Sequence, residues 1–303
     1  MSRDGLNRDT LFVLTLLVPI IVFVVILIYY PAIDTFATSL TNRNLRLNRP
    51  AEVIQLENYS YLLTNDEFWE VTGRSFVLVA ITLPLEMIIA LAGALLLNQR
   101  FPGRGVVRTL VILPWMVPPV VNGFLWGWLL NGEYGALNGF LYQFGLIQDY
   151  QYWLQNPQTQ IFWVAVVQTW TRFSFPMIIL LAGLQGIQDD LYEAAKVDGA
   201  SGFQRLFRIT MPLLLPSFAV ALVVEFIAVF QIFDVIWTLT AGGAAGGAIN
   251  PFTKTLMLFN YELVFRDLRI GRGAALSYLI LIMSLTVGLI FVRRLYNQGV
   301  KDT

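Results

Sequence analysis

Three ionisable side chains stand inside long apolar runs of this sequence. Glu86, Arg172 and Glu225 are each flanked by aliphatic and aromatic residues. Carboxylates in such surroundings can carry protons or do acid–base work, and an arginine can neutralise them. The 303 residues include neither cysteine nor histidine, which excludes disulfides, thiol nucleophiles, Ser-His-Asp catalysis and ordinary zinc sites. We therefore predict no catalytic residue and no metal site.

The composition indicates that much of the chain meets lipid. Hydrophobic residues make up 56% of the sequence and charged residues 13%, whereas a soluble domain carries about a quarter charged residues. The net charge is zero, so nothing suggests a nucleic-acid partner. The first apolar run, 11–30, is longer than that of a signal peptide, and we expect it to be retained as a span.

Six apolar runs are long enough to cross a bilayer, which takes about 20 residues for a helix. We predict an all-α polytopic membrane protein with a single transmembrane domain over 1–303. The six spans are expected at about 11–30, 74–97, 109–130, 160–184, 213–240 and 273–293. Five prolines interrupt three of these spans and predict kinked or broken helices that let the bundle rock: Pro84, Pro114, Pro118, Pro119 and Pro176.

The placement of lysine and arginine predicts the direction of the spans. Basic residues are present in the loop 98–108, in the stretch 186–212 and in the tail after 293, and they are absent from the loop 131–159. With six spans the basic segments share one side, which we assign to the cytoplasm together with both termini. The outer loops weaken this assignment because they also carry basic residues: Arg43, Arg46, Arg49, Lys254, Arg266 and Arg269.

The three ionisable residues lie at one predicted depth. Each is 11 or 12 residues from the cytoplasmic end of its span, which places it roughly 17–18 Å deep in a core about 30 Å thick. An isolated charge at that depth is costly and should pair, face inward or line water. We predict that Arg172 pairs with Glu225, with Glu86, or with both.

Further polar and aromatic residues are expected about 20–27 Å deep by the same count. Amide and hydroxyl groups hydrogen-bond the rim of a sugar ring, and aromatic faces stack on its C–H face. The predicted substrate pathway consists of Asn122, Trp126, Gln168, Arg172, Glu225, Gln231 and Tyr278, accompanied by Trp170 and Phe230. The alternative is structural, because buried polar groups often join neighbouring helices and tryptophans can anchor at the membrane interface.

A mixed-charge stretch, EAAKVDGASGFQRLFRITMP at 193–212, interrupts the apolar sequence between the fourth and fifth spans. Asp189 or Asp190 is expected to cap a first short helix, and Gly199 suits the left-handed residue that ends it. The stretch is either an elbow between two spans or a helix that docks on a partner.

A second short helix is predicted to follow. Ser201 and Gln204 have the spacing of a capping box, in which each side chain bonds the other residue's backbone amide. Pro212 is then expected to open the next span.

The spacing of this stretch resembles the EAA loop of membrane subunits of bacterial ABC importers. That pattern reads EAA, three residues, Gly, nine residues, Ile, one residue and Leu-Pro. Met211 replaces the usual leucine, and the matching residues are Glu193, Ala194, Ala195, Gly199, Ile209 and Pro212. Carbohydrate-type permeases also resemble this sequence in the segments 57–76, 113–138 and 230–243. The proline that often follows the glycine pair at the end of the last segment, here Gly242-Gly243, is missing.

The resemblance implies the permease fold of a type I ABC importer for a carbohydrate or related polyol. Within the loop 186–212, the residues implied to contact an ATPase are Glu193, Ala194, Ala195, Asp198 and Gly199. The sequence has no G-x-x-x-x-G-K-[ST] phosphate loop. ATP and Mg²⁺ would therefore be bound by partner subunits, and this chain would need no cofactor and would not be an enzyme.

The resemblance also implies the surroundings of the chain. It would lie in the bacterial cytoplasmic membrane beside a second homologous permease, as a heterodimer. Two ABC ATPases would bind on the cytoplasmic side, and an extracytoplasmic solute-binding protein would deliver the solute.

Two other classes are compatible with carboxylates inside the membrane. A proton-coupled secondary transporter would use Glu86 or Glu225 as proton carriers, but it would need no coupling helix, and many such folds show internal repeats that are not evident here. A membrane-embedded enzyme would use the two carboxylates as a catalytic pair, but no nucleophile motif accompanies them.

Overall fold

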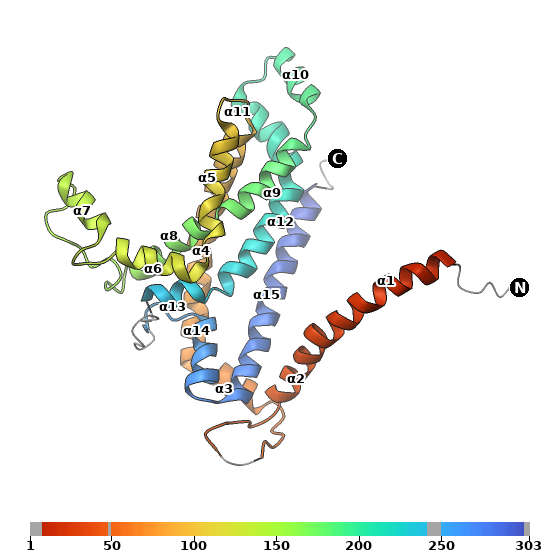
Figure 1. The fold of residues 1–303 in the computed structure, drawn as a ribbon, viewed down its shortest axis with the longest axis vertical. Helices are drawn as coiled ribbons and strands as arrows, with labels where there is room; N and C mark the ends of the chain where they lie inside the picture. Colours follow the sequence, from red (N-terminus) through yellow and green to blue (C-terminus); the bar gives the residue numbers. More distant parts are fainter. Residues whose placement is uncertain (1–7, 48–49, 241–249, 300–303) are drawn as a thin grey trace, which may run out of the picture. The chain divides into compact units, whose positions relative to one another are not determined.

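The computed structural model describes residues 8–47, 50–240 and 250–299 of the chain. Their secondary structure is helical, with one isolated bridge between Thr41 and Val53 and no strand within these ranges (Figure 1). The predicted cytoplasmic termini and part of the predicted glycine-rich outer loop lie outside the described residues, as do Arg49 and Lys301.

The contacts of the chain form two compact units, and α15 (Ile270–Gly299) begins in the first and ends in the second. The first unit comprises residues 1–65 and 260–281. It contains α1 (Arg8–Val24), α2 (Tyr30–Ser39) and α3 (Glu57–Thr64), together with the π-helical turns Val25–Tyr29 and Glu262–Arg266. The second unit comprises residues 66–259 and 282–303. Helix α15 is thus shared by the two units. The prediction of one transmembrane domain over 1–303 stays a prediction.

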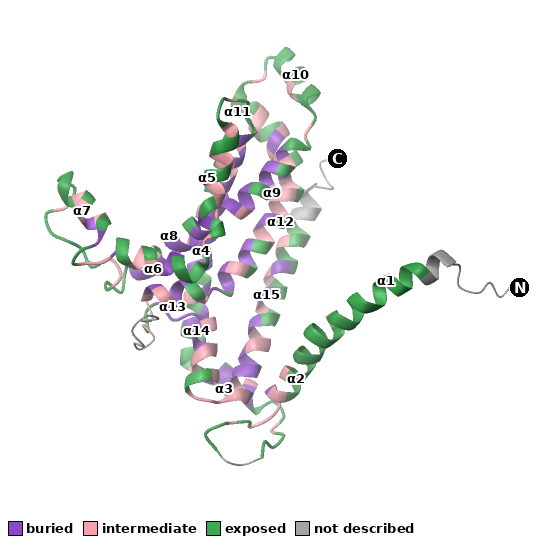
Figure 2. Ribbon diagram, viewed as in Figure 1, coloured by how far each residue is buried: buried purple, intermediate pink, exposed green. Residues whose placement is uncertain are grey.

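In the first unit, the side chains of α1 from Phe12 onward are almost all exposed (Figure 2). An apolar exposed helix is expected where the surroundings are lipid or another membrane chain. Asn58 of α3 secures the far end of α2, because its buried side-chain amide donates 2.8 Å hydrogen bonds to the carbonyl oxygens of Ser39 and Thr41.

The second unit holds most of the buried core. Its helices are α4 (Asp66–Asn98), α5 (Arg104–Met116), α6 (Pro119–Leu129), α7 (Ala136–Gln143), α8 (Gln160–Arg172), α9 (Ser174–Gln185), α10 (Asp189–Val197), α11 (Gly202–Arg205), α12 (Met211–Phe230), α13 (Asp234–Thr240) and most of α14 (Leu256–Tyr261). Helix α4 packs against α8, α9 and α12. Small residues allow close approach: a Cβ atom added at Gly93 would meet Met177, and one at Gly183 would meet Ser217.

Four helices of the described chain are long and apolar enough to cross a membrane, and two bent pairs raise the number to as many as six. The four are Phe12–Ser39, Asp66–Asn98, Gly202–Phe230 and Ile270–Arg294, and the bent pairs are Arg104–Met116 with Pro119–Leu129 and Gln160–Arg172 with Ser174–Gln185. This number agrees with the six spans expected from the sequence.

The prolines explain the two bends. The α5–α6 pair bends by 94° where Val117 and Pro118 leave the helical conformation. A residue before proline avoids that conformation, and proline lacks an amide donor. The α8–α9 pair bends by 49° just before Pro176, whose ring crowds the carbonyl group four residues earlier. Pro84 and Pro114, in contrast, lie inside the helices α4 and α5, so a break at these two prolines is wrong.

The fifth predicted span, 213–240, is too long. Helix α12 ends at Phe230, Gln231 leaves the helical conformation, and α13 starts separately at Asp234. The intervening segment contains neither proline nor glycine, so the local sequence does not predict the break. Helix α13 packs instead on α6, where a Cβ atom at Gly123 would clash with Thr238. Tertiary packing thus overrides the apolar run.

The absence of native cysteine allows the direction of the spans to be tested with single-cysteine variants. Val53 and Gln99 are both exposed and lie on opposite predicted sides. In intact cells, a membrane-impermeant maleimide should label Val53→Cys, whereas Gln99→Cys should need permeabilised cells. The reverse pattern would show that the orientation is inverted.

Candidate functional site

An ion pair joins two of the apolar helices, α8 and α12. Arg172 ends α8, and its Nε and Nη2 atoms donate hydrogen bonds of 2.7 and 3.2 Å to the two carboxylate oxygens of Glu225 on α12. Glu225 is fully buried, while the arginine side chain is 24% exposed. Two-point contact of this kind satisfies both carboxylate oxygens. One of the predicted pairings, Arg172 with Glu225, is therefore present.

Glu86 lies close to this pair without joining it. The side chain is fully buried on α4, and neither carboxylate oxygen has a hydrogen-bond partner among the described residues. It interacts electrostatically with both Arg172 and Glu225. The three predicted residues thus form one cluster on α4, α8 and α12, in which the arginine is committed to Glu225.

Two tryptophans of the predicted pathway contact each other. Trp126 on α6 and Trp170 on α8 have ring centroids 6.2 Å apart in an edge-to-face arrangement. Phe173, which the sequence analysis missed, extends the group, with its ring 6.0 Å from Trp170. Trp170 is exposed and Trp126 half-buried, so the group offers accessible aromatic surface.

Asn122 has a structural role in this conformation. Its buried side-chain amide donates a 3.0 Å hydrogen bond to the carbonyl of Pro114 and a longer one, 3.4 Å, to that of Val117. These carbonyls belong to the end of α5, where the bend before Pro118 removes their helical partners. The side chain therefore stabilises the 94° bend, and its contact with substrate stays a prediction.

The other predicted pathway residues are not gathered by the structure into one set of contacts. Gln168 is buried on α8, whereas Gln231 is exposed after α12, with a long contact of 3.5 Å to Ser284. Tyr278 belongs to the first unit and donates a 2.7 Å hydrogen bond to the carbonyl of Ala32. Phe230 is a core residue, 1% exposed and packed against other phenylalanines.

The predicted coupling loop begins with α10, which is entirely without buried residues. The expected aspartate cap is wrong: Gln188 precedes the helix without a side-chain cap, and Asp189 and Asp190 lie in the first turn. There their charges still favour the helix N-terminus. Gly199 ends the helix with φ +77°, as predicted. Backbone bonds from Ala200 to Ala195 and from Gly199 to Lys196 complete this C-terminal cap.

The second part of the loop contains the predicted capping box. The Gln204 side chain accepts a 2.8 Å hydrogen bond from the Ser201 amide, and the Ser201 hydroxyl accepts one of 3.3 Å in return. The predicted second helix is present as α11 and the π-helical turn Leu206–Thr210, and Pro212 lies in the first turn of α12 as expected. The helix runs on from Gly202 to Phe230, so only the expected boundary between the second helix and the next span is absent.

The loop presents both charge and apolar surface. Glu193, Ala194 and Asp198 are exposed, while Ala195 is half-buried. Large apolar side chains are exposed as well: Val197 at 89% and Phe203 at 73%. Exposed apolar residues rimmed by polar ones are typical of a protein–protein interface.

The chain belongs to the family described as the binding-protein-dependent transport system inner membrane component, whose profile matches residues 86–302. The resemblance seen in the EAA stretch is thereby confirmed, and the chain is a membrane permease of this family. It is 36% identical over 272 residues to the trehalose/maltose transport system permease protein MalF of Thermococcus litoralis, with 90% of each chain covered.

Two further similarities agree with this assignment. The chain is 33% identical to the sulfoquinovosyl glycerol transport system permease protein SmoG of Agrobacterium fabrum, covering 94% of this chain and 90% of the relative. Its fold resembles a chain in the crystal structure of a bacterial ABC transporter involved in the import of the acidic polysaccharide alginate. The TM-score is 0.81 with 23% identity, over 96% of each chain. The all-α importer permease fold is confirmed.

Removing one charge of the Arg172–Glu225 pair should lower the stability of the protein more than removing both charges. Arg172→Met leaves a buried carboxylate unpaired, which costs about 3–5 kcal/mol and should lower the Tm of the purified protein by about 5–10 °C. Arg172→Met combined with Glu225→Met removes both charges and should recover most of that loss. Glu86→Gln, a control without a hydrogen bond to break, should not lower the Tm. Equal Tm values for the single and double variants would show that the pair is not coupled.

Proposed function

We propose that this chain is the permease subunit of an ATP-driven importer that moves a carbohydrate or related polyol across the bacterial cytoplasmic membrane. The observation that carries the proposal is the exposed EAA loop in a chain of the binding-protein-dependent family. The curated relatives described above act on trehalose, maltose and a sulfoquinovosyl glycerol, which supports a carbohydrate. Family membership argues against the proton-coupled transporter.

The proposed complex contains a second, homologous permease, two ABC ATPases and an extracytoplasmic solute-binding protein. Both termini of this chain would be cytoplasmic. The ATPases would bind ATP and Mg²⁺, and this chain would supply the membrane passage.

The proposed coupling site is formed by Glu193, Ala194, Ala195, Asp198 and Gly199. The two alanines present no long side chain, so a partner surface can approach the helix closely. Glu193 is exposed and can form a charge-assisted contact with a basic group of the ATPase. When ATP binding moves the ATPases, α10 moves with them. The bundle then shifts between inward- and outward-facing packings because ATP binding changes the free energy of one packing relative to the other.

The proposed passage runs past Trp126 and Trp170, whose exposed ring surface can stack on sugar C–H groups. The Arg172–Glu225 pair has no net charge and therefore does not select an anionic solute by itself. The pair joins α8, the helix that carries Trp170, to α12, and we assign it the role of holding these helices together. Asn122, Gln168, Gln231 and Tyr278 stay predicted pathway residues.

The proposal is tested by purifying the complex with a C-terminal tag on this chain. A P-loop ATPase and a second six-span permease should co-purify with the wild type. Glu193→Lys reverses the charge at the docking surface without altering a span, so ATPase recovery and solute uptake should both fall at least about tenfold. Glu193→Gln should give a smaller loss. Recovery of the wild-type chain alone, active after reconstitution, would refute the proposal.

The sugar-stacking surface is tested with Trp170→Ala. Loss of one stacking face should raise the half-saturating solute concentration for uptake about fivefold to tenfold, because an aromatic contact contributes roughly 1 kcal/mol. Trp128→Ala is the control, since Trp128 is an exposed tryptophan of α6 without a ring contact to Trp170 among the described pairs. Equal effects of the two variants would place the passage elsewhere.

A further inference from the structure

The arginines of the predicted outer loops conflict with the rule that basic residues lie on the cytoplasmic side. The fold of the first unit brings three arginines together across more than two hundred residues of sequence. A surface cleft of about 450 Å³ is lined by Arg43, Arg269 and Arg272, with Asn42, Asn44 and Glu57 among its other residues. The lining of the cleft thus includes three arginines and one carboxylate, that of Glu57.

The backbone around this cleft is held by contacts between the loop after α2 and the start of α15. Leu45 donates a 2.9 Å hydrogen bond to the carbonyl of Leu268, and Gly271 donates one of 3.0 Å to the carbonyl of Arg43. Leu268 has a positive φ of 58°, a conformation that costs free energy for leucine and is common at functional sites. A Cβ atom at Gly271 would overlap the carbonyl of Thr41, so only glycine fits there.

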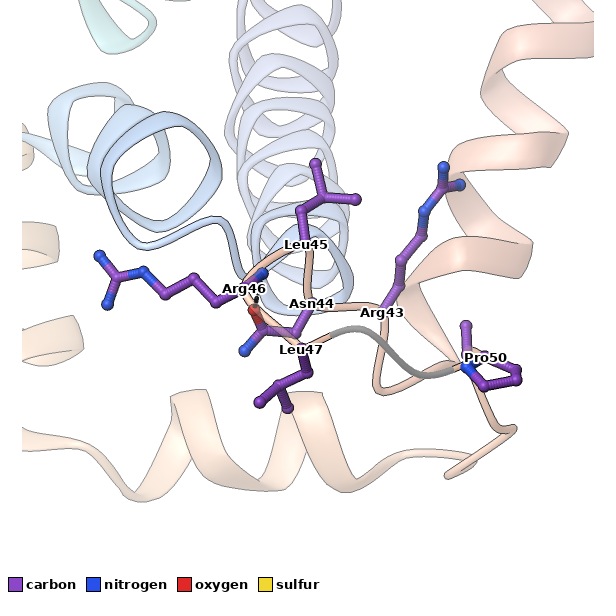
Figure 3. Close-up of a pocket in the computed structure, with 7 residues that line it drawn as sticks. Arg43, Asn44, Leu45, Arg46, Leu47 and Pro50 are labelled. Atoms are coloured by element: carbon purple, nitrogen blue, oxygen red, sulfur yellow. Dashed lines mark hydrogen bonds between the residues drawn. The ribbon is translucent and has the colours of Figure 1, made fainter.

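The arginines differ in how far their charge is already satisfied. Arg46, on the same loop, lies 3.7 Å from Asp267 and donates a hydrogen bond to the carbonyl of Arg266. Figure 3 shows Arg43 and Arg46 extending from opposite sides of the loop, with Asn44 bonded to the Arg46 amide. Neither Arg43 nor Arg269 has a carboxylate within 4 Å among the described residues. Arg272 lies over the ring of Tyr61 at 3.6 Å.

The cleft is lined by Arg43 and Arg269, which belong to the predicted outer loops, and the proposed orientation places those loops on the outer side. Helix α15 starts beside the cleft and runs without a break toward the basic residues Arg293 and Arg294, which mark the cytoplasmic end. The family is defined by its dependence on a binding protein, and that protein reaches the permease from the outer side.

The geometry points to the Arg43–Arg269–Arg272 cleft as a docking point for an acidic surface of the solute-binding protein. This inference rests on the proposed function and adds the place and the charge of the contact. Arginine binds carboxylates by paired hydrogen bonds. A rigid basic cleft would also steer an acidic partner during encounter, since charges at the rim of an interface act mainly on the association rate and its salt dependence.

The test measures ATP hydrolysis by the whole transporter in nanodiscs as its loaded solute-binding protein is titrated. The variant Arg43→Glu/Arg269→Glu should raise the half-stimulating concentration at least about tenfold and abolish its dependence on salt. The milder Arg43→Gln/Arg269→Gln should shift it in the same direction. Arg74→Gln is the control, because Arg74 is already paired with Glu70, and it should behave as wild type.

The outcomes separate this inference from the proposed function. A wild-type complex that responds to the binding protein, with unchanged half-stimulation in both cleft variants, would overturn the docking point and leave the function intact. A shift seen only in nanodiscs containing phosphatidylglycerol, and absent in phosphatidylcholine, would assign the cleft to a lipid headgroup and also overturn it. A wild type that responds to no binding protein would overturn both.

Cross-linking gives a readout that does not depend on activity. Since the chain has no native cysteine, Arg43→Cys can carry a benzophenone maleimide in the assembled transporter. Irradiation should attach it to the solute-binding protein, within a peptide that contains aspartate or glutamate. Phe203→Cys, on the exposed coupling loop, should instead attach to the ATPase. Attachment of the Arg43→Cys probe only to lipid or to the second permease would contradict the docking point.

Discussion

The structure is organised around the cost of placing charge inside a membrane. An arginine and a carboxylate at the bilayer centre are tolerated only when each satisfies the other. The Arg172–Glu225 contact does this with two hydrogen bonds, and it ties α8 to α12. Helix α4 packs against both and brings Glu86 to the same place. The close approach of α9 to α4 and to α12 depends on the small residues Gly93 and Gly183, because lipid offers no hydrophobic force to press helices together.

The broken helices follow from the same constraint. A bend of 94° between α5 and α6 frees backbone carbonyls that water cannot reach, and irregular backbone at this depth is tolerated only inside protein or along a cavity. Asn122 supplies two of the missing donors. A residue that looks like a substrate contact in the sequence is thus required first by the backbone. Of the aromatic group, Phe173 lies at the second break, between α8 and α9, and its ring is 6.0 Å from that of Trp170.

The sequence predicts the features that depend on composition and local chemistry. Apolar runs locate the membrane helices, Gly199 ends α10, and Ser201 with Gln204 forms the capping box. It fails where packing between distant segments decides. The end of α12 at Phe230 has no proline or glycine to announce it, and Phe230 is core although its depth suggested a passage. The outer arginines only weakened the orientation expected from the charge pattern, and only the fold shows that two of them, Arg43 and Arg269, share a cleft with Arg272.

The continuity of the helix from Gly202 to Phe230 has a mechanical consequence. Glu225 lies 23 residues beyond Gly202, about 35 Å along a rigid rod. A tilt of only about 10° at the cytoplasmic end would carry the far end sideways by about 6 Å, about twice the length of the hydrogen bonds of 2.7 and 3.2 Å that Glu225 accepts. A small tilt at the loop end of this helix would therefore move the Glu225 carboxylate farther than its hydrogen bonds to Arg172 can follow.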